Sequence, residues 1–141
     1  MEGPQLEPVM FLHTLNLSER KSFLALAIHL VHSDGEFADT EEQRLRSLRR
    51  EMALPADTEL PDDSLTVLPV PFSSQESRTK VVLGLLELAY IDGVFDPRER
   101  AMIKEIGTRF EMSTDDLNKL EDWTIRLSSL MEEAKGLWSA R

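Results

Sequence analysis

The chain has 141 residues, enough for one domain with a sizeable core, and its 41% hydrophobic and 30% charged residues are typical of a globular protein. Its 26 Asp and Glu residues outnumber its 16 Lys and Arg residues. The formal charge of −10 argues against nucleic-acid binding, which depends on basic side chains at phosphates. The absence of cysteine excludes disulfides, thiolate metal sites and cysteine nucleophiles.

The amino terminus shows no signal for secretion, because no basic segment followed by an apolar one is visible there. No apolar run approaches the roughly 18 residues that a membrane span requires. We therefore expect a cytoplasmic protein without direct membrane insertion. Residues 1–15 should form a flexible lead-in to a single helical domain over residues 16–141. Within this lead-in, the segment Met10-Phe11-Leu12 could pack back on the core.

The first predicted helix starts at a typical capping sequence. Asn16 or Ser18 can cap the helix, and Glu19, three residues after Asn16, can satisfy a further free N–H group of the first turn. The next apolar residues fall on more than one face, so the helix should be mostly buried as far as about His32. Gly35 then ends it, since glycine tolerates the left-handed backbone common after helices.

A second helix is expected over residues 39–52, closed by Pro55. Leu45, Leu48 and Met52 occur at helical spacing and should face the core. The other face is basic, and we interpret it as solvated or as a docking surface for an acidic partner. This basic face carries Arg44, Arg46, Arg49 and Arg50.

The connector, residues 55–72, combines four prolines with four acidic residues. Prolines lack an N–H group and are poor in helix interiors, so this segment should separate the two halves of the chain. Its apolar residues suggest that it lies along the surface of the core. These are Leu60, Leu65, Val67 and Leu68.

Three helices are expected in the second half. Ser73 and Glu76 have the spacing of a capping box and predict a mostly buried helix over about 74–90. Asp96-Pro97-Arg98-Glu99 combines a capping aspartate, a first-turn proline and a reciprocal glutamate. Ser113 or Thr114 should cap a last helix, over about 114–138. Its expected apolar side contains Leu117, Leu120, Leu127, Leu130, Met131 and Leu137.

An internal repeat organises these elements. Asp92-Gly93 follows Asp34-Gly35 by 58 positions, and a glutamate follows each Asp by seven residues, namely Glu41 and Glu99. No segment alternates at the period of a strand. We predict an all-α, compact helical domain built from two pseudo-symmetric helix–Asp-Gly–helix repeats, about 16–54 and 73–113, plus a long C-terminal helix.

Neither repeat can form an EF-hand calcium site by itself. With the Asp-Gly glycine at loop position six, positions one and three are Leu30 and His32 in the first copy, and Leu88 and Tyr90 in the second. Calcium requires about 6–8 oxygen ligands, so these residues exclude a complete site in either loop. The replacement of His32 by Tyr90 also disfavours a symmetric histidine site.

Two half-sites could still share one divalent cation, Ca²⁺ or Mg²⁺. The candidate ligands are the repeated carboxylates Asp34, Glu41, Asp92 and Glu99. In the alternative interpretation each Asp forms a turn before Gly and each Glu caps a helix, without any metal. Both interpretations are open. Spacing supports no catalytic arrangement, so we expect no enzyme, and a metal-dependent hydrolase is the least favoured class.

These motifs resemble those of the TerB-like (tellurite-resistance) proteins. The resemblance rests on Ser33-Asp34-Gly35-Glu36-Phe37 with Glu41, and on Ile91-Asp92-Gly93-Val94-Phe95 with Glu99. It covers about residues 18–118. It implies an all-α domain of two pseudo-repeats whose acidic loops form a candidate cation site. Family members belong to stress-response systems, and a related domain forms the amino-terminal part of the DjlA membrane co-chaperone.

We therefore expect a non-enzymatic, cytoplasmic, stress-response-type domain. It would bind a divalent cation and dock a protein partner through its acidic Asp-Gly loops. The chain lacks the His-Pro-Asp motif of a J domain, so co-chaperone activity does not carry over, although a membrane-associated complex fits the resemblance. The alternative is a metal-free protein–protein interaction module that uses the arginine face or the last helix.

Overall fold

A computed structural model describes residues 12–32, 39–61, 65–90 and 96–139. These residues form five α-helices and one short 3-10 helix, η1 (Leu12–Thr14), and the described part contains no strand. The α-helices are α1 (Leu17–Val31), α2 (Asp39–Glu51), α3 (Gln75–Tyr90), α4 (Pro97–Arg109) and α5 (Thr114–Ser139). The predicted all-α class is confirmed. Within the described ranges, no helix is both long enough and apolar enough to cross a membrane.

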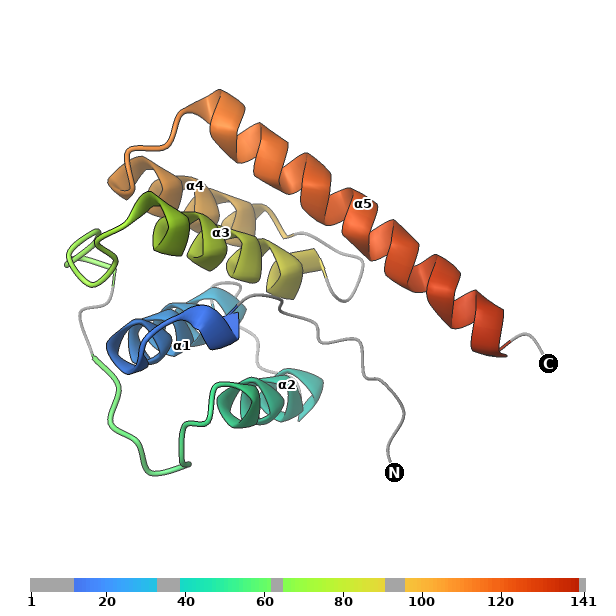
Figure 1. The fold of residues 1–141 in the computed structure, drawn as a ribbon, viewed down its shortest axis with the longest axis horizontal. Coiled ribbons are helices and arrows are strands. Elements are labelled where there is room, and N and C mark those ends of the chain that lie inside the picture. Colours follow the sequence, from blue (N-terminus) through green and yellow to red (C-terminus); the bar gives the residue numbers. More distant parts are fainter. Residues whose placement is uncertain (1–11, 33–38, 62–64, 91–95, 140–141) are drawn as a thin grey trace.

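The central helix is α3, which contacts η1, α1, α4 and α5. Its interior residues, among them Val81, Val82 and Leu85, are fully buried, as the apolar sequence on several faces predicts. Helix α2 packs against α1 on the other side of the bundle, and α5 runs along α3 (Figure 1). The core thus lies where α1, α3 and the apolar stripes of α2 and α4 meet.

The helix bounds keep the offset of the sequence repeat. Helices α1 and α3 start 58 positions apart, and α2 and α4 both start and end 58 positions apart. Each of the second helices ends in the same hydrogen-bonding pattern, with Leu54 N donating to Arg49 O and Met112 N donating to Gly107 O. The arrangement of the two pairs about a pseudo-two-fold axis stays a prediction.

A left-handed residue follows the C-cap of both helices. Ala53 has φ of 56° and Glu111 has φ of 63°, so both occupy the conformation that glycine usually supplies at this position. The two residues are again 58 positions apart. The left-handed conformation therefore recurs at equivalent positions after α2 and α4, although neither position is a glycine.

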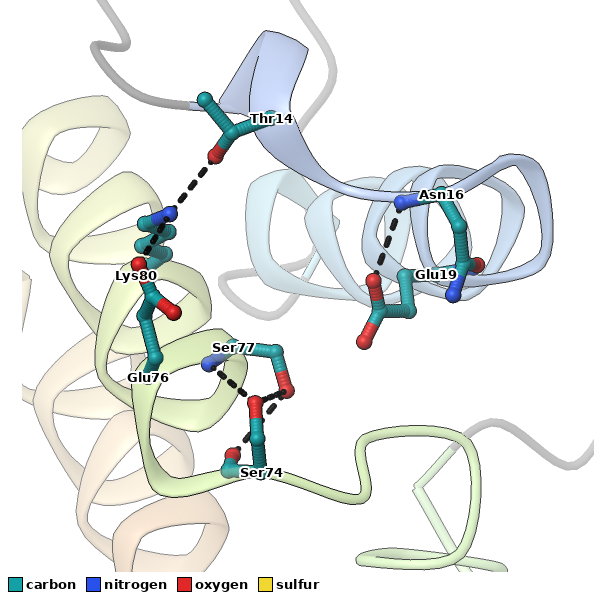
Figure 2. A network of polar contacts seen from close by, with 7 residues as sticks. All are labelled: Thr14, Asn16, Glu19, Ser74, Glu76, Ser77 and Lys80. Carbon is teal, nitrogen blue, oxygen red and sulfur yellow. Dashed lines mark hydrogen bonds and ion pairs between the residues drawn. The ribbon is translucent and has the colours of Figure 1, made fainter.

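The start of α1 is capped by Asn16, one of the two residues that the sequence offers for this role. Asn16 Oδ1 accepts from Glu19 N at 2.8 Å, and Glu19 Oε1 accepts from Asn16 N at 3.0 Å (Figure 2). Immediately before it, Leu12 and Leu15 are buried in the core. The last residues of the expected flexible lead-in are therefore packed, and residues 1–11 lie outside the described part.

The predicted capping box at Ser73 and Glu76 is wrong by one position. Ser74 Oγ accepts from Ser77 N at 3.0 Å, so Ser74 is the capping residue of α3 (Figure 2). Glu76 instead pairs with Lys80, which also donates to Thr14 in η1 at 2.7 Å. The reason is that Phe72 is buried and its carbonyl accepts from Arg78 Nε at 2.8 Å, which fixes the backbone two residues before the cap.

The connector is attached to the core, as expected from its apolar residues. Leu68 and Phe72 belong to the buried cluster, and Leu60 and Leu65 pack against it. Phe72 contacts Phe110 at the end of α4 edge to face. The connector thereby fixes the start of α3 relative to the end of α4.

Candidate functional site

The structure describes one of the four predicted cation ligands in full. Asp34 and Asp92 lie within residues 33–38 and 91–95, outside the described residues. Glu41 belongs to the first turn of α2, but its side chain is also outside them. Glu99 is the third residue of α4. The convergence of these carboxylates on one cation therefore stays a prediction.

Glu99 makes the capping contact that the alternative interpretation predicts. Its Oε1 accepts from Asp96 N at 3.2 Å, while Asp96 Oδ1 accepts from Arg98 N at 2.7 Å. This box stabilises the helix start that directly follows the second Asp-Gly loop. A carboxylate can accept several bonds, so capping by Glu99 is compatible with either interpretation. Among the described side chains, no three His, Asp or Glu residues gather as a metal site.

A polar cluster at the end of α3 was not expected from the sequence. Arg100 Nη1 of α4 donates to both carboxylate oxygens of Glu121 in α5, at 2.8 and 3.1 Å. Tyr90, the last residue of α3, lies beside this pair. Burial raises the pKa of the Tyr90 phenol above its ordinary value, and the negative charge of Glu121 raises that pKa further. The cluster joins three helices, and sequence spacing gives no signal for it. Tyr90 lies shortly before the second Asp-Gly sequence along the chain.

Helix α5 is much longer than the helices it packs on. Its 26 residues correspond to about 39 Å, whereas the 16 residues of α3 correspond to about 24 Å. The first half of α5 is held by the bundle, where Thr124 is buried. Farther along, Leu127 and Met131 of α5 line a small cavity of about 50 Å³ with Glu87 and Tyr90 of α3. The C-terminal end of α5 then extends past the other helices (Figure 1).

The second half of α5 carries an exposed apolar surface. Leu130 is 60% exposed, Leu137 is 76% exposed and Trp138 is 62% exposed, and the partly buried Ala134 lies between them on the helix. Their spacing of i, i+4, i+7 and i+8 places all four on one side of α5. We call Leu130, Ala134, Leu137 and Trp138 the α5 patch. Leu130 and Leu137 were expected on the apolar side of α5, but both are exposed. Met131, one residue after Leu130, still lines the cavity with α3, so Leu130 is exposed because it lies on a side of α5 that faces away from α3.

Residues 69–122 match the family model described as tellurite resistance protein TerB. The chain is TerB-like over this segment. The match includes the end of the connector, α3, the second Asp-Gly loop, α4 and the beginning of α5. Asp92 and Glu99 therefore lie inside the TerB-like segment, whereas Asp34, Glu41 and the α5 patch lie outside it. No curated protein and no solved structure matches the chain.

Proposed function

We propose that this TerB-like chain acts as a non-enzymatic interaction domain, and that its α5 patch docks a helix of a protein partner. The supporting observation is the exposure of Leu130, Leu137 and Trp138 on a helix that extends beyond the bundle. Exposed apolar residues are common singly, but a contiguous set on one helix face indicates a surface used for binding. Aromatic side chains such as Trp138 are also enriched at the centre of interfaces.

The spacing and charge of this segment favour a helix over a lipid surface as the occupant. Partner helices are recognised through apolar anchors spaced i, i+3 or i+4, and i+7, which is the pattern of the α5 patch. Anionic membranes attract clusters of Lys and Arg. Around the patch, Arg126 and Lys135 are balanced by Glu132 and Glu133, and the whole chain carries −10. The patch therefore has apolar anchors without the basic residues that membrane surfaces select.

The proposal is tested by removing the apolar anchors without disturbing the bundle. In extracts of the natural host, the tagged chain should migrate as a complex larger than the monomer. The double variant Leu130→Ser/Leu137→Ser should lose this complex while keeping its helical circular dichroism, because both side chains are exposed. Leu17→Ser, which changes an exposed leucine on α1, is the matched control and should keep the complex. A complex that survives in the double variant would overturn the proposal.

A second candidate function is the binding of Ca²⁺ or Mg²⁺ by Asp34, Glu41, Asp92 and Glu99. It is supported by the equal offset of the helix bounds, because an Asp-Gly sequence lies between the two helices of each pair along the chain. The presence of Asp92 and Glu99 inside the TerB-like segment supports the same proposal. A titration of the melting temperature with each cation tests it. The stress-response role and the cytoplasmic location expected from the sequence remain part of this proposal.

A further inference from the structure

A second surface, on the opposite half of the molecule from the TerB-like segment, has the character of a binding groove. It lies along the C-terminal half of α2 and the residues that follow, and has a volume of about 610 Å³. Three of its lining residues are arginines and none is acidic, although the chain as a whole carries −10. The groove is lined by Gln43, Arg46, Ser47, Arg49, Arg50, Leu54, Pro55 and Ala56.

The three arginines are oriented by local contacts. Arg46 Nη2 pairs with Glu42 at 2.6 Å, and Arg49 Nη1 donates to the Pro55 carbonyl at 3.0 Å. Arg50 Nη2 donates to Ser47 Oγ at 3.3 Å. Each guanidinium has five N–H donors, so these contacts position the groups while leaving donors for a carboxylate.

Helix α5 contacts one part of the corresponding surface of the second helix pair. By the 58-residue offset, Arg46 and Arg49 of α2 correspond to Lys104 and Gly107 of α4. Leu117 of α5 packs directly on Gly107, where a Cβ atom would lie 2.6 Å from Leu117 Cδ2. Lys104 and Leu117 also line one cavity. Leu117 thus lies at the position on α4 that corresponds to Arg49 of the arginine groove. By contrast, Lys104 and Thr108, the counterparts of Arg46 and Arg50, are exposed.

The part of α5 that contacts α4 is acidic. The first turns of α5 contain Asp115, Asp116, Glu121 and Asp122, together with the apolar Leu117. Glu121 pairs with Arg100 of α4. After α2, the chain continues instead into the proline-rich connector, and α2 carries arginines where α4 has Gly107 and Thr108. The groove on α2 is therefore better suited to an acidic segment than its counterpart on α4.

We propose that the arginine groove of α2 binds an acidic amphipathic segment of a partner protein. Carboxylates of that segment would pair with Arg46, Arg49 and Arg50, and an apolar residue would contact the surface formed by Pro55 and Ala56. A short segment fits better than nucleic acid or a lipid surface, because an extended polyanion would also face the rest of a chain of charge −10. Charges act over only about 8 Å at physiological salt, which confines the attraction to the groove.

The test uses a fluorescently labelled 15-residue peptide that would carry Leu on one face of a helix and Glu on the opposite face. Fluorescence anisotropy measures its binding to the chain. The wild-type chain should bind it, and binding should weaken as salt increases. Arg46→Gln/Arg50→Gln should reduce affinity at least about tenfold, since charge-assisted bonds are lost. Arg126→Gln, on α5, is the matched control and should bind normally. The peptide with Lys in place of Glu is the charge-reversed control, and its binding should not weaken in Arg46→Gln/Arg50→Gln.

Both substituted arginines are exposed, so the double variant should fold, and circular dichroism checks this. If the double variant does not fold, the single variant Arg50→Gln is compared with the wild type instead, and its affinity for the peptide should still be lower. Equal affinity of the wild-type chain and the arginine variants for the peptide would overturn the proposal. The absence of peptide binding by the wild-type chain would also overturn it. Preferential binding of heparin or anionic vesicles, lost in the same variants, would also overturn it in favour of a phosphate or sulfate surface.

Discussion

Phe72 and Phe110 meet edge to face, with their ring centroids 5.7 Å apart and their planes at 81°. Phe72 ends the connector and Phe110 is the C-cap residue of α4, so this contact joins two segments that are distant in the sequence. Both rings are buried, and Phe72 is fully so. The pair fixes the chain path into α3, on which every other long helix except α2 packs.

Phe72→Ala should lower the free energy of unfolding by about 3–5 kcal/mol, because a fully buried ring is lost and a cavity is left. Denaturant unfolding followed by circular dichroism measures this change. Val70→Ala changes an exposed residue of the same connector and should stay within about 0.5 kcal/mol of the wild type. Similar effects of the two substitutions would show that the connector is not held by Phe72.

Ala53→Gly and Glu111→Gly should each stabilise the protein by up to about 1 kcal/mol. Both residues have positive φ, where a Cβ atom costs roughly 1–2 kcal/mol, and part of the gain is offset because glycine makes the unfolded chain more flexible. Ala56→Gly, at an exposed position in the same loop as Ala53, is the control and should destabilise slightly. If both glycine variants melt below the wild type, these positions are not strained.

Tyr90 should ionise at a higher pH than a free tyrosine, whose pKa is about 10. Burial and the charge of Glu121 both raise the pKa of its phenol, so Glu121→Gln should lower that pKa toward the ordinary value. The chain has a single tyrosine, so ultraviolet absorbance of the phenolate reports on this group alone. Glu105→Gln, on the exposed side of α4, should leave the titration unchanged. An unchanged titration in Glu121→Gln would exclude the coupling between α3 and α5.

Ca²⁺ or Mg²⁺ should raise the melting temperature if the repeated carboxylates share one ion. A cation that binds only the folded state adds about 2.7 kcal/mol at a hundredfold excess over its Kd. Asp34→Asn and Asp92→Asn keep the turn-forming side chain but remove a charge, so each should fold and lose most of the cation effect. Asp115→Asn, on α5, is the control for ionic strength. A wild-type melting curve that millimolar cation leaves unmoved would exclude the shared site.

Much of the fold could be predicted from the sequence because each helix carries its own apolar stripe and most carry a recognisable cap. The cap of α3 was misplaced because Ser73 and Ser74 are chemically equal, and burial of Phe72 decides between them. The exposure of Leu130 and Leu137 could not be predicted either. Helical spacing identifies the apolar residues of α5, but only the structure shows that Leu127 and Met131, and not Leu130, face α3.

The sequence predicts less of the candidate cation site than of the fold. Asp34 and Asp92 are identified by their repeat, but a repeat in sequence does not state whether two loops meet in space. The capping contact of Glu99 follows from local spacing, since Asp96 lies three residues before it. The cluster of Tyr90, Arg100 and Glu121 depends instead on how α5 crosses α4, which is a tertiary property without a local signal.

The interaction proposed for the α5 patch is tested most directly by placing a photo-crosslinking amino acid at position 130 and, separately, at position 132. Two residues along a helix correspond to about 200°, so position 132 lies on nearly the opposite side of α5. Position 130 should give one discrete crosslinked protein in cells of the natural host, position 132 should not, and Leu137→Ser should remove the product. Equal products from both positions, no product from position 130, or a product that Leu137→Ser leaves unchanged would contradict the account.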